Sequence, residues 1–169
     1  MKRMKSLAVV VFICLGLMLL SSSASADPVA VGDTIYLFDG YGTTNGGEFI
    51  IKKDLGGGNT SDELFRSFCL EENEYISLSN STTLKPFTIT SITDYAANGG
   101  KSGQAESNKD PLDFRTAYLY YHYRIGDLHT LSPSFNYNTD TGANDLQKAI
   151  WFIEGEGGDN NYLVTLATG

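Results

Sequence analysis

The sequence predicts an α+β fold in a single domain, with a mainly β first half followed by a small two-helix part. Residues 29–87 consist of short apolar or aromatic runs broken by glycine and asparagine, a pattern typical of strands joined by tight turns in a meander or sandwich. Two segments with helix-capping residues follow, near 110–124 and 146–154. Residues 27–169 are enough to bury a core as one domain.

Residues 1–26 have the three parts of a secretory signal peptide: a basic start, an apolar run from Leu7 to Leu20, and small residues ending in Ala24-Ser25-Ala26. The apolar run is shorter than the roughly 20 residues that a transmembrane helix needs. We therefore expect an exported protein, extracellular or at the cell surface, without membrane insertion of the mature chain.

The mature chain is strongly acidic. The signal peptide takes three of the 12 basic residues and none of the 20 acidic residues, which leaves a net charge of −11. Such a surface disfavours nucleic acid and anionic lipid as partners, because both require clustered lysine and arginine. Since Cys14 lies in the signal peptide, Cys69 is the single cysteine that remains, and an internal disulfide is excluded.

Strands are expected in the first half at residues 35–38, 48–51, 64–70 and 88–92. Asp39-Gly40, residues 44–47 and residues 56–59 supply the glycines and asparagines that tight turns require. Residues 96–110 are polar and lack an apolar period, so we expect a surface loop there. A final strand is expected at 162–166.

Two helices are expected in the second half. Asp110 followed by Pro111 predicts a helix start, and this helix should run to about Arg124 and close at Gly126. Four tyrosines cluster within it and are expected to pack on the sheet: Tyr118, Tyr120, Tyr121 and Tyr123.

The second helix should be capped by Asn144 or Asp145, run over residues 146–154 and end at Gly155. Its apolar stripe consists of Leu146, Ala149, Ile150 and Ile153. Gln147 lies beside this stripe in the expected first turn, where the positive end of the helix dipole would polarise an acyl carbonyl.

Cys69 and Gln147 together suggest an internal thioester. A lone thiol in an exported protein would be oxidised or mispaired unless another group claims it. A thiolate held against the carbonyl carbon of Gln147 can displace ammonia, provided that the site orients the two groups and excludes water. Arg66 and Lys148 are the cations nearest in sequence that would favour the thiolate.

These residues resemble a known family. Phe68-Cys69-Leu70 resembles the aromatic-Cys-aliphatic motif of bacterial surface thioester domains, and residues 146–151 resemble their Gln-x-Ala-Ile-Trp motif. The stretches 116–120, 124–128 and 154–156 resemble the variant found in exported proteins with a PEP-CTERM sorting tail. The resemblance, which spans about Asp33 to Glu156, implies a β-sandwich or barrel with a small helical part, a strand-to-helix cross-link, and covalent adhesion to host or matrix surfaces. The residues expected to support the cross-link are Phe68, Leu70, Ala149, Ile150 and Trp151.

The expected function is therefore covalent attachment by a secreted or surface-exposed bacterial adhesin that is not an enzyme. Cys69 would supply the sulfur and Gln147 the acyl group, and the acceptor would be an amine or hydroxyl of an extracellular or host-surface protein or polysaccharide. No catalytic residue, cofactor or metal is expected. The sequence has no Leu-Pro-x-Thr-Gly signal and no Pro-Glu-Pro tail, so we expect either a truncated chain or a released protein.

Two other hypotheses stay open. In the first, the chain is a structural or passively binding matrix protein of the same fold, in which Cys69 is buried and inert. In the second, the chain is a cysteine-dependent acyl-transfer enzyme, although neither His122 nor His129 lies in a hydrolase motif. Less favoured sites are a calcium loop at Asn136, Asn138, Asp140 and Gly142, and glycosidase-like carboxylates among Glu71, Glu72, Glu74, Glu154 and Glu156.

Overall fold

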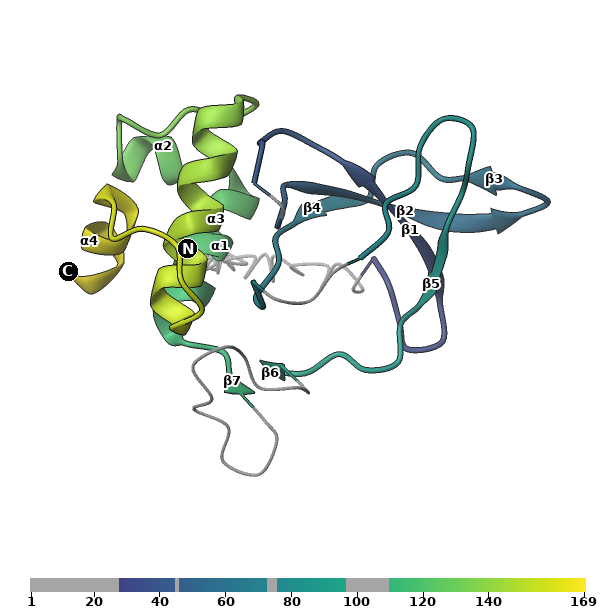
Figure 1. Cartoon of the computed structure of the whole chain (residues 1–169), viewed down its shortest axis with the longest axis horizontal. Helices are drawn as coiled ribbons and strands as arrows, with labels where there is room; N and C mark the ends of the chain where they lie inside the picture. Colours follow the sequence, from purple (N-terminus) through teal and green to yellow (C-terminus); the bar gives the residue numbers. More distant parts are fainter. Residues whose placement is uncertain (1–27, 45, 73–75, 97–109) are drawn as a thin grey trace, which may run out of the picture.

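The computed structural model describes residues 28–44, 46–72, 76–96 and 110–169, so the expected signal peptide at 1–26 lies outside the described residues. A β-sheet built by the first half of the chain lies beside a group of helices built by the second half (Figure 1). The predicted α+β class, with strands first and helices after them, is confirmed. No helix within the described ranges is long and apolar enough to cross a membrane.

The sheet has five antiparallel strands: β1 (Thr34–Asp39), β2 (Phe49–Gly56), β3 (Asn59–Thr60), β4 (Phe65–Ser67) and β5 (Pro86–Thr88). Their order is β3-β2-β1-β5, and β4 pairs with the first part of β2. Phe49 and Ile51 are buried and alternate along β2, so they lie on one face of the sheet. Tyr36 is also buried, but it pairs with Lys52 and therefore lies on the other face. β1 to β5 form one open sheet, so the sandwich or barrel stays a prediction.

Two strands are shorter or shifted relative to the prediction. β4 ends at Ser67 rather than at Leu70, because its partner β2 begins at Phe49, opposite Ser67. The strand expected over 88–92 is instead β5, since its partner β1 begins at Thr34, opposite Thr88. The ends of both strands are therefore determined by their pairing partners, which the local sequence does not reveal.

A short ribbon joins the two halves of the molecule. It pairs β6 (Tyr95–Ala96) with β7 (Asp110–Pro111), and residues 97–109 of the expected loop lie outside the described residues. The prediction that Asp110-Pro111 starts a helix is wrong, because both residues belong to β7. The first helix begins three residues after Pro111 and is capped by Asp113, which accepts a hydrogen bond from the backbone N–H of Arg115 at 2.8 Å.

The helices are α1 (Phe114–Ile125), α2 (Leu128–Leu131), α3 (Asp140–Glu154) and α4 (Tyr162–Thr168). α1 closes at Gly126 and α3 at Gly155, both in the left-handed conformation that favours glycine, as predicted. The strand predicted at 162–166 is wrong, because this segment is α4, capped by Asn161. Leu163 and Val164 bury their side chains in the core that the helices share.

The cap predicted for α3 is also wrong. Thr139 caps this helix by accepting a hydrogen bond from the Gly142 N–H at 3.0 Å, so α3 begins at Asp140 instead of residue 146. Asn144 and Asp145 are helical residues whose side chains reach Thr43 and the Tyr162 hydroxyl. Gln147 therefore lies in the middle of α3 rather than in its first turn.

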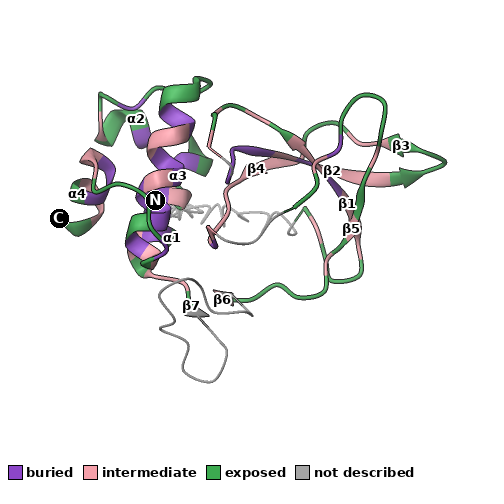
Figure 2. Cartoon of the chain, in the orientation of Figure 1, coloured by how far each residue is buried: buried purple, intermediate pink, exposed green. Residues whose placement is uncertain are grey.

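The main hydrophobic core lies among the helices (Figure 2), and its buried members are Leu119, Tyr123, Leu128, Phe135, Leu146, Ala149, Ile150, Ile153, Leu163 and Val164. Phe68 and Leu70 pack against this core from the segment that follows β4. Of the tyrosines expected to cluster, Tyr123 is buried, whereas Tyr118 and Tyr121 are exposed. Residues 68–70 thus link the sheet to the helical layer.

Candidate functional site

The amide group of Gln147 is held by the main chain of Cys69. The Cys69 N–H donates to Oε1 of Gln147 at 3.0 Å, and Nε2 of Gln147 donates to the Cys69 carbonyl oxygen at 2.7 Å. Gln147 is completely buried, with 0% of its surface exposed. The two residues expected to form the cross-link are therefore in direct contact, and both hydrogen-bonding ends of the amide are fixed.

The thiol of Cys69 has its own hydrogen bond, from Sγ to the carbonyl oxygen of Glu71 at 3.0 Å. The N–H and the carbonyl group that hold the Gln147 amide both belong to Cys69, and its Cα, which lies between them, carries the side chain that ends in Sγ. Rotation about the Cα–Cβ bond changes the direction of Sγ relative to Gln147 without moving the main chain. The Gln147 amide is thus held in place, whereas the position of Sγ depends on one torsion, that about the Cα–Cβ bond of Cys69.

The dipole of α3 contributes less to this site than the sequence predicts. Gln147 lies two turns after Asp140, the first residue of α3, and the dipole acts mainly within the first turn of a helix. The group that polarises the Gln147 carbonyl is instead the Cys69 N–H. This donor was missed because sequence spacing does not show where a main-chain N–H points.

Two glycines cover the amide on its other side, at the point where the chain enters β2. A Cβ at Gly47 would lie 3.2 Å from Oε1 of Gln147, and the Gly46 carbonyl accepts a second hydrogen bond from the Cys69 N–H at 3.0 Å. A Cβ at Gly46 would overlap the Trp151 ring, 2.6 Å from Cη2, and would lie 2.9 Å from Cδ of Gln147. Only glycine permits this close approach.

The start of α3 anchors the loop that leads to these glycines. Asp140 accepts a hydrogen bond from the Gly42 N–H at 2.9 Å, and Asn144 accepts from the N–H groups of Thr43 and Thr44 at 2.8 and 3.2 Å. Two residues of the less favoured calcium loop thus have other partners, since Asp140 accepts from Gly42 and Asn138 accepts a hydrogen bond from Arg66. One helix therefore carries Gln147 and also positions the segment that covers it.

A buried ionic cluster lies between the sheet and α1. Glu48, which follows Gly47, is 2% exposed and accepts a hydrogen bond from Arg66 at 2.9 Å and another from the Tyr123 hydroxyl. Arg66 also pairs with the more exposed Glu63 at 2.9 Å. The sequence pattern did not predict this cluster, although an acidic residue at the start of a buried strand usually needs a partner.

Two pKa shifts in this cluster keep Arg66 charged and Tyr123 protonated. Burial opposes the charge of Arg66, but the hydrogen bond to Glu63 and the charges of Glu48 and Glu63 outweigh it and raise the pKa of the guanidinium above its usual value. Burial, followed by the hydrogen bond to Glu48 and the charge of Glu48, raises the pKa of the Tyr123 hydroxyl well above its usual range. Tyr123 therefore remains a protonated donor at physiological pH.

The cations considered as neighbours of the thiol have acidic partners elsewhere. Arg66 belongs to the cluster with Glu48, and Lys148 pairs with Asp159 at 2.8 Å on an exposed part of α3. His122, considered for an enzyme, lies 2.8 Å from Asp127 through Nδ1, between the ends of α1 and α2. Among the described residues, no group of three acidic, histidine or cysteine side chains is placed to hold a metal ion.

The five residues expected to support the cross-link are buried or pack on the helical core. Ala149, Ile150 and Trp151 are buried in α3, at 0%, 1% and 6% exposure. Phe68 contacts the ring of Tyr123 edge to face, with 5.2 Å between the ring centroids, and Leu70 packs on the same core. The residues on either side of Cys69 are therefore anchored on the helical core.

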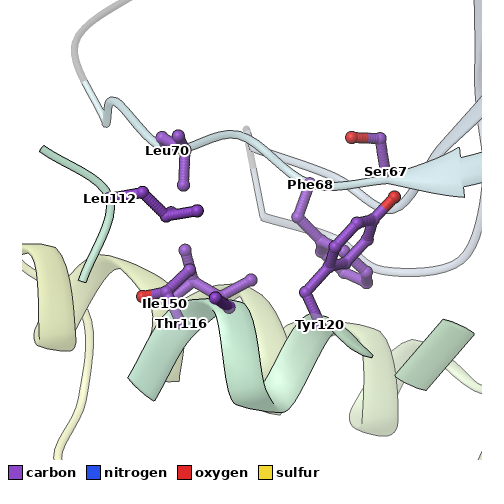
Figure 3. A pocket seen from close by; sticks show the side chains of 8 residues that line it. Ser67, Phe68, Leu70, Leu112, Thr116, Tyr120 and Ile150 are labelled. Atoms are coloured by element: carbon purple, nitrogen blue, oxygen red, sulfur yellow. The ribbon is translucent and has the colours of Figure 1, made fainter. Parts of the chain in front are cut away.

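A pocket of about 200 Å³ lies next to this site (Figure 3). Its walls come from the end of β4 and the segment after it, from α1 and the segment before it, and from α3. The lining residues are Ser67, Phe68, Leu70, Leu112, Thr116, Ala117, Tyr120 and Ile150. The wall is mostly apolar and contains no charged side chain. Cys69 and Gln147 are not among the lining residues, although Phe68 and Leu70 are the chain neighbours of Cys69.

Replacing Gly46 with alanine is expected to lower the free energy of unfolding by about 1–3 kcal/mol. The added methyl group would displace Trp151 and the amide, which a well-packed core resists. Chemical denaturation would measure the loss. Gly58→Ala is the control, because its Cβ meets nothing within 4 Å and its φ of +79° alone costs about 1 kcal/mol. If the Gly46→Ala protein were as stable as wild type, the Trp151 ring would move aside at no cost in stability, which would contradict this prediction.

Comparison of the chain with protein-family models, with curated proteins and with solved structures gives no match.

Proposed function

We propose that this chain is a secreted or surface-exposed bacterial protein in which Cys69 and Gln147 form an internal thioester that attaches covalently to a partner. The observation that carries the proposal is the completely buried Gln147 amide, bound at both ends by the main chain of Cys69. The same proposal includes export through the signal peptide and the β-sandwich or barrel that the family resemblance implies.

The bond would form by exchange of ammonia for sulfur. The Cys69 thiolate attacks Cδ of Gln147, and the tetrahedral intermediate expels the amide nitrogen, which leaves as ammonia after taking up the thiol proton. The charge that develops on Oε1 is stabilised by the Cys69 N–H, which already lies 3.0 Å from that oxygen. Holding the two groups in contact supplies the orientation that an unactivated amide requires.

Attachment would then proceed in one turnover. A primary amine of the partner attacks the thioester carbonyl, the carbon–sulfur bond breaks, and the sulfur takes up a proton to become the Cys69 thiol. The product is an amide between the partner and the side chain of residue 147, or an ester when the nucleophile is a hydroxyl. Because the acyl group is consumed, the protein is an adhesin rather than an enzyme, and its partner is an extracellular or host-surface protein or polysaccharide.

A passive role is the second candidate, in which Cys69 remains a thiol. The observation that favours it is the hydrogen bond from Sγ to the Glu71 carbonyl, which gives the thiol a partner other than Gln147. In that case the paired hydrogen bonds of Gln147 would serve only to fasten the segment after β4 to α3. The two candidates differ in whether Cys69 can be alkylated in the purified protein.

The experiment is the intact mass of the protein purified without amines, beside Cys69→Ala and Gln147→Met variants. We expect the wild type alone to lack one ammonia, to resist alkylation at Cys69, and to gain one methylamine with release of an alkylatable thiol. A wild type of full mass with an alkylatable Cys69 would contradict the thioester and favour the passive role. Loss of ammonia in Cys69→Ala would instead assign it to another residue.

A further inference from the structure

We propose that the pocket between α1, α3 and the segment after β4 is a non-covalent binding site for a phenol, an aromatic ring that carries a hydroxyl group. This site is separate from the proposed thioester, because Cys69 and Gln147 are not among the residues that line it. Phenol binding should therefore be the same in the wild type and in the Cys69→Ala protein, whether or not ammonia is lost from Gln147.

Three parts of the chain that are distant in sequence enclose the pocket (Figure 3). Phe68 and Leu70 follow β4, Thr116 and Tyr120 belong to α1, and Ile150 belongs to α3. The first two side chains and Tyr120 pack against the helical core, and Thr116 and Ile150 are 2% and 1% exposed. Because the core fixes these walls, the hollow exists before a ligand enters, as is usual for small-molecule sites.

The size and the polarity of the pocket favour a small neutral ring. Its volume of about 200 Å³ exceeds that of an engineered apolar cavity of about 150 Å³ that binds benzene. No charged side chain is among the described residues that line it, so a charged ligand would lose water without gaining a counter-ion. A phenol is uncharged at neutral pH, because its pKa is about 10.

Two aromatic side chains in the wall favour an aromatic ligand over an aliphatic one. Phe68 is held by its edge-to-face contact with Tyr123, with 5.2 Å between the ring centroids. Tyr120 is held by its hydroxyl, which donates to the carbonyl oxygen of Arg66 at 2.8 Å. An aromatic pair strengthens binding about two- to tenfold beyond the effect of buried area. Both rings are already positioned, so the ligand does not have to order them.

The hydroxyl group of Thr116 explains why the ligand should carry a hydroxyl. Thr116 lines the pocket from α1, and its Oγ1 is buried without a hydrogen-bond partner among the described residues. Buried hydroxyls are usually hydrogen-bonded, and a hydroxyl can both donate and accept. Threonine in a helix has two favourable χ1 rotamers, so rotation about the Cα–Cβ bond can direct Oγ1 toward a ligand. The hydroxyl of a phenol would then supply the missing partner.

The test is a titration of the purified protein with p-cresol, followed by two-dimensional amide NMR. We expect saturable shifts at lining residues such as Leu70 and Ala117, with equal affinity in the Cys69→Ala protein. Toluene, which lacks only the hydroxyl, should bind about two- to tenfold more weakly, because it cannot pair with Thr116. Benzoate should bind more weakly still, because it is charged. The proposal would be overturned if p-cresol caused no saturable shift at the lining residues, or if toluene or benzoate bound as tightly.

Two variants connect this binding to the pocket. Ala117 is exposed at the pocket wall, so the larger side chain of Ala117→Leu should fill part of the hollow and weaken p-cresol at least about tenfold. Ala30→Leu, at an exposed position outside the pocket, is the matched control and should leave the affinity unchanged.

Thr116→Val keeps the shape of the side chain and removes its hydroxyl, so p-cresol and toluene should bind this variant about equally. Unchanged binding of p-cresol to Ala117→Leu would place the ligand elsewhere and overturn the site. A Thr116→Val protein that still prefers p-cresol would overturn the role of the hydroxyl and, with it, the phenol as the ligand class.

A further titration distinguishes the two sources of a phenol. N-acetyl-tyrosine methylamide carries the same ring on a peptide unit. An affinity near that of p-cresol would show that the pocket accepts a tyrosine side chain of a partner. An affinity at least about tenfold lower would assign a free phenolic molecule, since the peptide unit would then obstruct entry.

Discussion

Replacing Arg66 with methionine is expected to lower the free energy of unfolding by about 3 kcal/mol. The change leaves the carboxylate of Glu48, 2% exposed, with the Tyr123 hydroxyl but without its cation. Removing one partner of a buried ion pair costs about 3–5 kcal/mol, and the lower end applies because 24% of the Arg66 side chain is exposed. Urea denaturation at neutral pH would measure the loss.

Arg115→Met is the matched control for this prediction. Arg115 pairs with Asp113 at 2.7 Å, but both side chains are partly exposed, at 29% and 25%, so the change should cost less than about 1 kcal/mol. Adding Glu48→Gln to Arg66→Met should recover part of the lost stability, because no charge then remains buried. Equal losses for Arg66→Met and Arg115→Met would show that Glu48 finds water or another partner.

The sequence was informative where local chemistry determines structure. The apolar and aromatic runs located β1 and β2, and the glycines at 126 and 155 marked the ends of α1 and α3 because the left-handed conformation there favours glycine. The apolar stripe of α3 was correct because helical spacing places those residues on one face.

Sequence reasoning failed where a distant segment decides the outcome. Thr139, rather than Asn144, caps α3, because Asn144 is occupied by the loop at Thr43, about a hundred positions earlier in the chain. Residues 162–166 have an apolar, branched pattern that suits a strand, but they lie against the helical core and form α4. Local propensity yields to such tertiary contacts.

The candidate site also combines features that local sequence predicts with features that depend on distant segments. The contact between Cys69 and Gln147 was predicted from residue type and order, whereas the glycines next to the amide and the Glu48–Arg66 pair became visible only in three dimensions. The Gly46-Gly47 pair directly before an apolar strand was the one available signal, because paired glycines often mark a close approach of the backbone. Its neighbours, Trp151 and Gln147, lie about a hundred positions away in sequence.

Replacing Gln147 with glutamate in a Cys69→Ala background is expected to make stability fall as pH rises above about 4.3. In its protonated form the introduced carboxyl can reproduce both hydrogen bonds of the amide, donating to the carbonyl oxygen of residue 69 and accepting from its N–H. Complete burial disfavours the ionised form, so the pKa of this carboxyl in the folded protein should lie above the unfolded value of about 4.3.

The direction of the pH dependence follows from that shift. Below about pH 4.3 the carboxyl is protonated in both states, and stability should be close to that of the Cys69→Ala protein. Between the unfolded pKa and the higher folded pKa, the unfolded chain binds fewer protons, so the free energy of unfolding falls by about 1.4 kcal/mol per pH unit, for a total of about 2–4 kcal/mol. Urea denaturation at pH 4, 5, 6 and 7 measures this slope.

Gln147→Met in the same background separates charge from lost hydrogen bonds. Methionine has a similar length and cannot ionise, so its cost relative to Cys69→Ala should be the same at each pH, whereas the cost of Gln147→Glu should grow with pH. A pH-independent cost for Gln147→Glu would mean that water reaches residue 147 in the folded protein. A site open to water would also hydrolyse a thioester, so the buried amide and the proposed chemistry depend on the same exclusion of solvent.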